Sequence, residues 1–203
     1  MGSGMKWYII TSDQGKKIRP VQEYLMKKYV PDARPVWLDL EDKPIKEWCA
    51  NLHNMIIGNE PTRTCVLMLD DHLILDRVTR SISIPASFER VELGKRNKNH
   101  KTCKVYSYRF LEYTDATPYK VSTQPSIWRT EALLRVLREV SGTPWDFEVK
   151  GRCKAGIVQE PIINVIEESA LSRKWKGVNL RGMKQEDIDY IIEKGLLSKD
   201  EIK

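Results

Sequence analysis

Two carboxylates and an imidazole follow one another in this chain, at Asp70, Asp71 and His72. They come directly after the apolar run 65–69, which is typical of a strand buried on both faces of a parallel sheet. In open α/β sheets, ligands bind just beyond the carboxyl ends of such strands. Oxygen ligands and an imidazole nitrogen at this point favour a divalent metal that holds a phosphorylated substrate. The simpler alternative is that Asp70 or Asp71 caps a helix beginning at Leu73, with His72 merely exposed.

The first half of the chain alternates strand-like and helical segments. Strands are predicted at residues 7–11, 35–38 and 65–69, and helices at residues 18–29 and 45–57, where apolar residues recur at helical spacing. This alternation favours right-handed crossovers and a mostly parallel sheet. The sequence therefore predicts a single α/β domain, with a mostly parallel sheet flanked by helices. The polar turn after the first strand and the acidic cluster after the third are expected to face one crevice.

The second half has a different character. A helix is predicted at residues 130–140, with Thr130 as its N-cap, and Gly142, Thr143 and Pro144 break it. A last helix is predicted from about residue 185 to 194, stopped by Gly195. The remaining predictions are weaker: irregular or weakly extended chain at residues 83–93, and strand-like segments at residues 105–110, 119–123 and 162–166.

Length and composition limit the class of protein. With 203 residues, of which 31% are charged, the chain fits one domain, and no apolar run approaches the ~20 residues of a membrane span. Residues 1–4 resemble the remnant of an expression tag; residues 5–180 are expected to form the domain, and residues 181–203 a helical tail packed on it. A strand-like run begins at once, without a signal peptide, so we expect a cytoplasmic protein. The four cysteines lie far apart, which favours reduced thiols, with Cys49 and Cys65 in the core.

The net charge of +6 and the isoelectric point near 9.1 permit a polyanionic partner without demanding one. Two basic clusters could contact phosphates, of nucleic acid or of a charged donor, or could be solvated turns. They are formed by Lys95, Arg96, Lys98 and Lys101 and by Arg173, Lys174 and Lys176.

Three segments occur in a recognisable order: Val66-Leu-Met-Leu-Asp-Asp-His72, Ser122-Thr-Gln-Pro-Ser-Ile-Trp-Arg129 and Thr143-Pro-Trp-Asp-Phe-Glu148. Together they resemble a group of small nucleotide-sugar-dependent glycosyltransferases of the GT-A type, found in bacteria and in large viruses and phages. In that group a strand ends in an acidic pair, a Gln-Pro-x-Ile-Trp stretch precedes a helix, and a Pro-Trp-acidic-Phe-Glu stretch follows it. The resemblance covers residues 7–176 and implies a GT-A-like (Rossmann-like) fold.

The resemblance also implies roles for the first motif and the first strand. Asp70, Asp71 and His72 would occupy the metal and diphosphate site, where the group more usually has Asp-x-Asp. This departure leaves open whether Asp70, Asp71 or both carboxylates reach the ion. Thr11 and Asp13 match the turn that grips the nucleotide base and ribose.

For the later motifs, the resemblance implies that Gln124 and Trp128 line the sugar pocket and that Asp146 or Glu148 serves as general base. Arg129 could pair with a phosphate of the donor, or with a neighbouring acid. Asp146 stands between two aromatic residues, so desolvation could raise its pKa toward a useful value. Alternatively, Trp128 is a packing residue, and the aromatic residues beside Asp146 anchor a loop while both acids face solvent.

The expected activity is transfer of a sugar from a nucleoside-diphosphate donor, a UDP-sugar in the first instance, to a hydroxyl. Mn²⁺ or Mg²⁺ would neutralise the leaving diphosphate, and a carboxylate would take the acceptor's proton. The basic charge favours DNA with hydroxymethylated pyrimidines as acceptor, as in phage genomes, over a bacterial surface polysaccharide precursor. A non-catalytic nucleic-acid-binding protein on a degenerate form of the fold is the alternative from another class. The sugar, and retention or inversion at its anomeric carbon, stay open.

Overall fold

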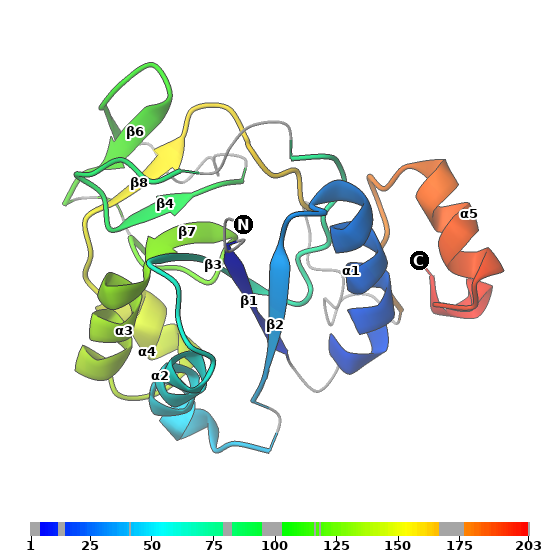
Figure 1. Cartoon of the computed structure of the whole chain (residues 1–203), viewed down its shortest axis with the longest axis horizontal. Coiled ribbons are helices and arrows are strands. Elements are labelled where there is room, and N and C mark those ends of the chain that lie inside the picture. Colours follow the sequence, from blue (N-terminus) through cyan, green and yellow to red (C-terminus); the bar gives the residue numbers. More distant parts are fainter. Residues whose placement is uncertain are drawn as a thin grey trace.

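Eight strands form one sheet in the part of the chain that the computed structural model describes, residues 5–11, 15–40, 42–78, 83–94, 103–115, 117, 119–166 and 177–202. The strand order is β2-β1-β3-β7-β4-β8-β6-β5 (Figure 1). The strands are β1 (Lys6–Thr11), β2 (Arg34–Asp39), β3 (Thr64–Leu69), β4 (Arg90–Glu92), β5 (Cys103–Val105), β6 (Phe110–Tyr113), β7 (Ser126–Arg129) and β8 (Ala155–Val158). The helices are α1 (Gly15–Tyr29), α2 (Trp48–Gly58), α3 (Thr130–Glu139), α4 (Pro144–Lys150) and α5 (Gln185–Glu193), with 3₁₀ turns η1 (Ile45–Glu47) and η2 (Lys199–Glu201).

Strands β1 and β3 are buried on both faces, which explains their continuous apolar runs. On β1, Trp7 and Ile9 join the hydrophobic cluster that α1 covers, and Tyr8 and Ile10 join the cluster under α2, α3 and α4. Successive side chains of β1 therefore point to opposite faces of the sheet. Helix α1 covers one face, and α2, α3 and α4 cover the other (Figure 1). The fold is an α/β domain.

The prediction of a mostly parallel sheet is wrong. Three strand pairs are parallel (β1 with β2, β1 with β3, β4 with β8) and four are antiparallel. Parallel neighbours need a long crossover, usually a helix, and β1, β2 and β3 follow one another along the chain with a helix between each pair. Strand β7 instead enters antiparallel between β3 and β4, and β5 and β6 form a hairpin.

Several segment predictions in the second half are also wrong. Residues 105–110 hold the end of β5, the hairpin turn and the start of β6 rather than one strand. Residues 119–123 form bends, and residues 162–166 make only an isolated bridge between Val165 and Ile74. Strands β7 and β8 were not predicted, β4 lies in the segment predicted as irregular or weakly extended, and the chain after Thr143 continues as helix α4.

The predictions for the first half are confirmed within a few residues at β1, α1, β2, α2 and β3, and so are the helices α3 and α5. Thr130 is the first residue of α3 rather than its cap. Cys49 and Cys65 are buried, and the four cysteines are free thiols. In the described ranges, no helix has the length and apolar character to cross a membrane.

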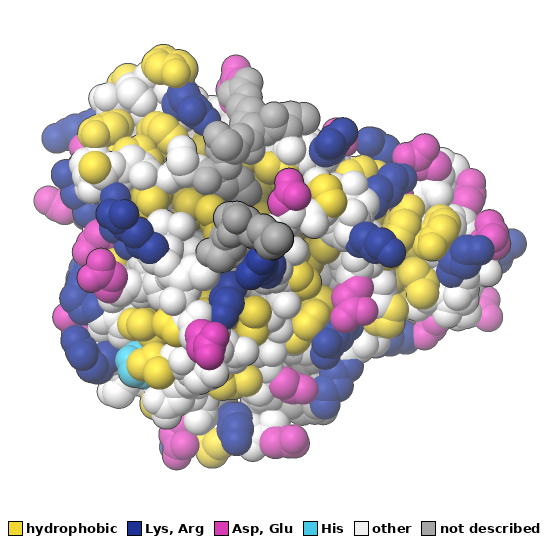
Figure 2. Space-filling view, in the orientation of Figure 1, with side chains coloured by type: hydrophobic (Ala, Val, Ile, Leu, Met, Phe, Trp, Pro, Cys, Tyr) yellow, Lys and Arg dark blue, Asp and Glu magenta, His cyan; other side chains and the backbone are white. Residues whose placement is uncertain are grey.

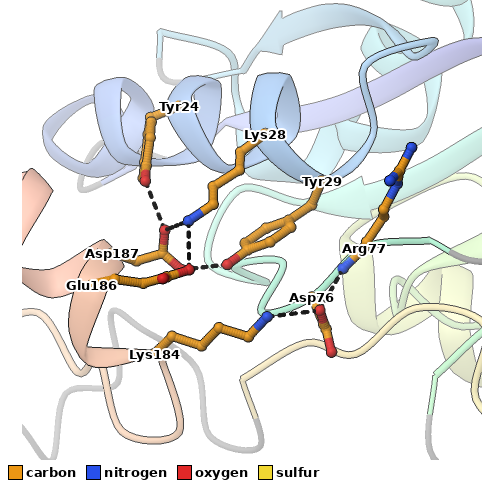
Figure 3. A network of polar contacts seen from close by, with 8 residues as sticks. All are labelled: Tyr24, Lys28, Tyr29, Asp76, Arg77, Lys184, Glu186 and Asp187. Atoms are coloured by element: carbon orange, nitrogen blue, oxygen red, sulfur yellow. Dashed lines mark hydrogen bonds and ion pairs between the residues drawn. The ribbon is translucent and has the colours of Figure 1, made fainter.

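The tail helix α5 is tied to α1 through one buried carboxylate, that of Asp187 (Figure 3). Tyr24 and Lys28 each lie 2.7 Å from its Oδ1, and Tyr29 donates to its Oδ2. Burial alone would raise the pKa of Asp187, but these donors outweigh burial and lower it. The side chain of Tyr190 also stacks on Tyr24, with ring centroids 4.3 Å apart. Helix α5 therefore packs on α1.

Candidate functional site at the carboxyl edge of the sheet

The strand directions bring several polar residues to one edge of the sheet. Strands β1, β3 and β4 run the same way, and β7 runs opposite to β3 and β4. The carboxyl ends of β1, β3 and β4 therefore share an edge with the start of β7. Thr11, Asp70, Glu92 and Ser126 stand at these positions, as predicted for the first two.

Asp70 is turned toward helix α1. It is 2% exposed, and its backbone N–H donates to Ile10 O at 3.0 Å, which continues the β1–β3 ladder. A Cβ added to Gly15, the first residue of α1, would lie 1.3 Å from Asp70 Oδ2. The first turn of α1 has no acid of its own, so Asp70 supplies the negative charge that a helix N-terminus favours.

The imidazole of His72 is buried without a hydrogen bond. The residue is 7% exposed, and neither Nδ1 nor Nε2 finds a hydrogen-bond partner among the described residues. Asp71 Oδ1 lies 3.6 Å from Nδ1, which is beyond hydrogen-bond distance. Gln22, itself buried in α1, holds the turn by donating to the carbonyl of His72 at 3.2 Å. A fixed backbone therefore presents an imidazole whose two ring nitrogens have no hydrogen-bond partner among the described residues.

Three carboxylates lie around this imidazole. Burial lowers the pKa of His72, and the charges of Asp71, Glu92 and Glu148 act in the opposite direction without overcoming burial. The ring is therefore neutral at physiological pH, which is the form that can bind a metal or share a proton. The local charge is acidic, although the chain as a whole is basic.

Glu92 was not predicted as a site residue. It is 5% exposed at the carboxyl end of β4, and its Oε2 accepts from Arg90 Nη2 at 3.1 Å and from the Tyr113 hydroxyl at 3.0 Å. Arg90 is fully buried and also donates to Lys120 O. The sequence signal was the spacing of two between Arg90 and Glu92, which places both side chains on one face of a strand.

Glu148 has one oxygen fixed and one unengaged. Its Oε1 accepts from the backbone N–H of Thr123 at 2.8 Å and from the Thr123 hydroxyl at 2.9 Å. Its Oε2 makes no hydrogen bond to a described residue. Helix α4 thus brings a partly exposed carboxylate to the segment that leads into β7, in an orientation set by Thr123. This arrangement suits a general base, which needs a fixed geometry and a free lone pair.

The expected raised pKa of Asp146 is wrong. Its Oδ2 accepts from Thr143 N at 2.9 Å and Thr143 Oγ1 at 2.7 Å, which forms a capping box at the start of α4, and its Oδ1 lies 2.7 Å from Lys150. Hydrogen bonds from Lys150 and Thr143 hold the pKa of Asp146 well below its usual value. Trp145 is 68% exposed, so the expected desolvation does not occur. The Thr-x-x-Asp spacing was the signal for this cap.

Two residues predicted to bind the nucleotide sugar lie elsewhere. Trp128 is fully buried in the core, with its ring centroid 6.2 Å from that of Phe147. Arg129 stands at the far end of β7, opposite Thr64 at the start of β3, and donates to Phe88 O and Pro85 O. Because β7 is antiparallel to β3, its last residues lie beside the start of β3, at the opposite edge of the sheet from the candidate site. Gln124, which precedes β7, is exposed at the expected edge.

Thr11 ends β1 with its hydroxyl buried and without a hydrogen-bond partner in the described ranges. The remaining predicted contact residues lie outside the described residues: Asp13, Lys95, Arg96, Lys98, Lys101, Arg173, Lys174 and Lys176.

Asp70, Asp71 and His72 do not converge on one point. Among the described residues, no group of three or more His, Cys, Asp or Glu side chains is placed to hold a metal ion. Asp71 and His72 remain neighbours, however, and their side chains are a hard oxygen donor and a neutral nitrogen donor. Mg²⁺ commonly takes only one or two protein ligands and completes its shell with substrate phosphates and water. The pair fits an ion of that kind.

Comparison of the chain with protein-family models, with curated proteins and with solved structures finds no match.

Proposed function

We propose that the protein is a metal-dependent glycosyltransferase that moves a sugar from a nucleoside-diphosphate donor to a hydroxyl acceptor. The observation that carries the proposal is the buried imidazole of His72, which has no hydrogen-bond partner among the described residues and lies 3.6 Å from Asp71. Buried polar atoms are normally satisfied, so an unsatisfied pair of ring nitrogens at the carboxyl edge of the sheet favours a ligand at this place.

The surrounding charge supports a metal-bound diphosphate rather than a free one. Glu92 and Glu148 add to the negative charge of Asp71, and the guanidinium of Arg90 is already bonded to Glu92. An unaccompanied diphosphate would be repelled here. Mn²⁺ or Mg²⁺, held by Asp71 and His72, would neutralise the charge that develops on the leaving diphosphate.

Glu148 is the proposed base. With Oε1 held by Thr123, the carboxylate can receive the proton of an acceptor hydroxyl on Oε2. Asp146 is not proposed for this role, because both of its oxygens are engaged. Thr11 and Gln124 stand at the same edge and are proposed to contact the nucleotide and the sugar.

The finer assignment to the GT-A type is also part of the proposal. It rests on the order of the three sequence motifs and on the β2-β1-β3 unit, whose parallel strands and flanking helices are typical of nucleotide-binding folds. For the acceptor, the net charge of +6 favours DNA with hydroxymethylated pyrimidines over a neutral glycan precursor.

Thermal unfolding with UDP tests the proposal, in Mn²⁺ and again with the metal chelated. A ligand at about a hundred times its dissociation constant adds ~2.7 kcal/mol of stability, so a metal-dependent rise in Tm is expected. If neither UDP nor any other nucleotide shifts Tm in the presence of Mn²⁺, the proposal fails.

A further inference from the structure

The β5–β6 hairpin displays apolar and aromatic side chains to solvent. Val105 is 77% exposed, Tyr106 44% and Tyr108 87%, all within four consecutive positions. Scattered exposed hydrophobic residues are normal, but a cluster of this kind on one turn marks a contact surface.

The turn is held in place rather than loosely tethered. The backbone N–H groups of Tyr106 and Ser107 both donate to Phe110 O at 3.1 Å, and Gln159 Nε2 donates to Ser107 O at 2.6 Å. The ring of Tyr106 packs on Phe88 with centroids 4.7 Å apart. A preorganised turn presents Tyr108 without the entropic cost of ordering a loop on binding.

The charge of the segment around the hairpin is one-sided. Between Glu92 and Glu112 the sequence contains six Lys and Arg residues and no acid. The charge of this segment, +6, is as large as the formal net charge of the whole chain. Two of these cations, Lys104 and Arg109, belong to the described hairpin, whose one acid, Glu112 on β6, stands opposite Lys104. Figure 2 shows hydrophobic side chains beside Lys and Arg over this end of the molecule. Aromatic residues interleaved with cations are the combination that binds nucleic acid strands.

The turn also lies on the same edge of the sheet as the candidate site. Strand β4 has the same direction as β3, since both are antiparallel to β7, and β8 is parallel to β4. Strand β6 is antiparallel to β8 and β5 is antiparallel to β6, so β5 runs in the same direction as β3 and β4. Four strand spacings of ~4.8 Å separate β3 from β6, or about 19 Å along the edge. A nucleic acid strand that covers this distance can touch the hairpin and the site together.

We infer that the hairpin binds nucleic acid, with Tyr108 stacking on an unpaired base and with Lys104 and Arg109 facing phosphates. The inference rests on the proposed function only where it names nucleic acid as the acceptor class. An acceptor base must leave its stack to reach an enzyme's site, and an exposed ring about 19 Å away along the same edge can stack on another unpaired base of that strand.

Fluorescence anisotropy with a labelled single-stranded DNA oligonucleotide, without UDP or metal, tests the inference. Tyr108→Ala is expected to weaken binding roughly tenfold to hundredfold, since base stacking on an aromatic residue has that effect. Tyr108→Trp should retain binding, and Arg109→Gln should reduce the salt dependence by about one released ion. Ile57→Ala and Arg138→Gln, which change an exposed apolar residue on α2 and an exposed cation on α3, are the controls and should bind as the wild type.

Tyr108→Leu separates stacking from simple apolar contact. If this variant binds the oligonucleotide as well as the wild type does, or if the wild type binds anionic lipid vesicles and not the oligonucleotide, the inference is wrong. The shift of Tm with UDP and Mn²⁺ is measured on the same variants and should not change. Loss of that shift in every protein, with oligonucleotide binding intact, would refute the glycosyltransferase and leave the hairpin surface standing.

Discussion

The carboxylate of Asp70 fills the space that a side chain on Gly15 would occupy, because a Cβ on Gly15 would lie 1.3 Å from Asp70 Oδ2. The end of β3 and the start of α1 are therefore in direct contact. The Asp70 side chain packs against α1, whereas Asp71 and His72 belong to the candidate site. The contact also explains why a residue without a side chain begins α1.

Gly15→Ala is expected to destabilise the protein by about 1–3 kcal/mol, the usual cost of forcing extra atoms into a packed region. Chemical denaturation measures this loss. Gly58→Ala is the matched control, because a Cβ at Gly58 meets nothing within 4 Å, and alanine stabilises a helix by roughly 0.5–1 kcal/mol over glycine. In an Asp70→Ala background the cost of Gly15→Ala should shrink; equal costs in both backgrounds would contradict the contact.

Asp71→Asn is expected to abolish the metal-dependent rise in Tm with UDP, because it removes the charged oxygen donor beside His72. Asp70→Asn should instead lower the stability of the free protein, by up to ~2 kcal/mol for a charge at a helix N-terminus, and should keep the shift. Differential scanning fluorimetry measures both effects. The opposite pattern, with the shift lost only in Asp70→Asn, would move the metal to Asp70.

Glu148→Gln is expected to reduce turnover by about 10²–10⁴-fold while leaving Tm nearly unchanged, since the amide can still accept from Thr123 but cannot take a proton. Thr143→Ala is the comparison on the same helix. It removes the N-cap of α4 and should cost about 1 kcal/mol of stability without loss of turnover. Full activity in Glu148→Gln would exclude the carboxylate as the base.

Acid should weaken the junction between α1 and α5 through Asp187. The folded-state pKa of Asp187 lies below its ordinary value of 3.8, so its contribution to the free energy of unfolding is complete above that value. The contribution is lost as the pH falls through the lowered pKa. Urea unfolding at a series of acidic pH values should therefore show a smaller pH dependence for Asp187→Asn than for the wild type. Identical slopes for the two proteins would contradict the assignment.

Removal of a single donor to this carboxylate should also be measurable. Tyr29→Phe is expected to cost roughly 1.5–3 kcal/mol, the usual range for a hydrogen bond to a charged group, because the buried Asp187 Oδ2 loses the hydroxyl that donates to it. Denaturation at neutral pH provides the comparison with the wild type.

The parts of the fold that the sequence predicts best are those buried on both sides. β1 and β3 are continuous apolar runs with helical segments between them, so periodicity and length identify them. β7 was missed because Arg129 and Thr130 are consecutive: the strand passes directly into α3 with no turn residue between them. The β5–β6 turn was missed because Tyr106-Ser-Tyr-Arg109 contains no Gly or Pro and alternates like a strand.

The residues of the candidate site also divide into those that local sequence patterns predict and those that depend on strand pairing. Asp71, His72 and Glu148 come from local motifs, and the edge expected for the first two is the edge where they lie. The presence of Glu92 at the site and the position of Arg129 at the opposite edge of the sheet depend on which strands are neighbours and in which direction they run. No local sequence pattern encodes that. The expected raised pKa of Asp146 is wrong because a carboxylate three residues after a threonine can accept hydrogen bonds from a helix N-terminus, which lowers its pKa.

The position of β7 has a consequence for how this chain reaches its native state. Four residues, Ser126–Arg129, join the β2-β1-β3 group to the β4-β8-β6-β5 group, and no other strand bridges the two groups in the described sheet. During synthesis, β3 therefore keeps an unpaired apolar edge until residues 70–125 have been made and β7 follows. Such an edge invites pairing with other chains, so a nascent chain of this protein is most vulnerable to aggregation before β7 emerges.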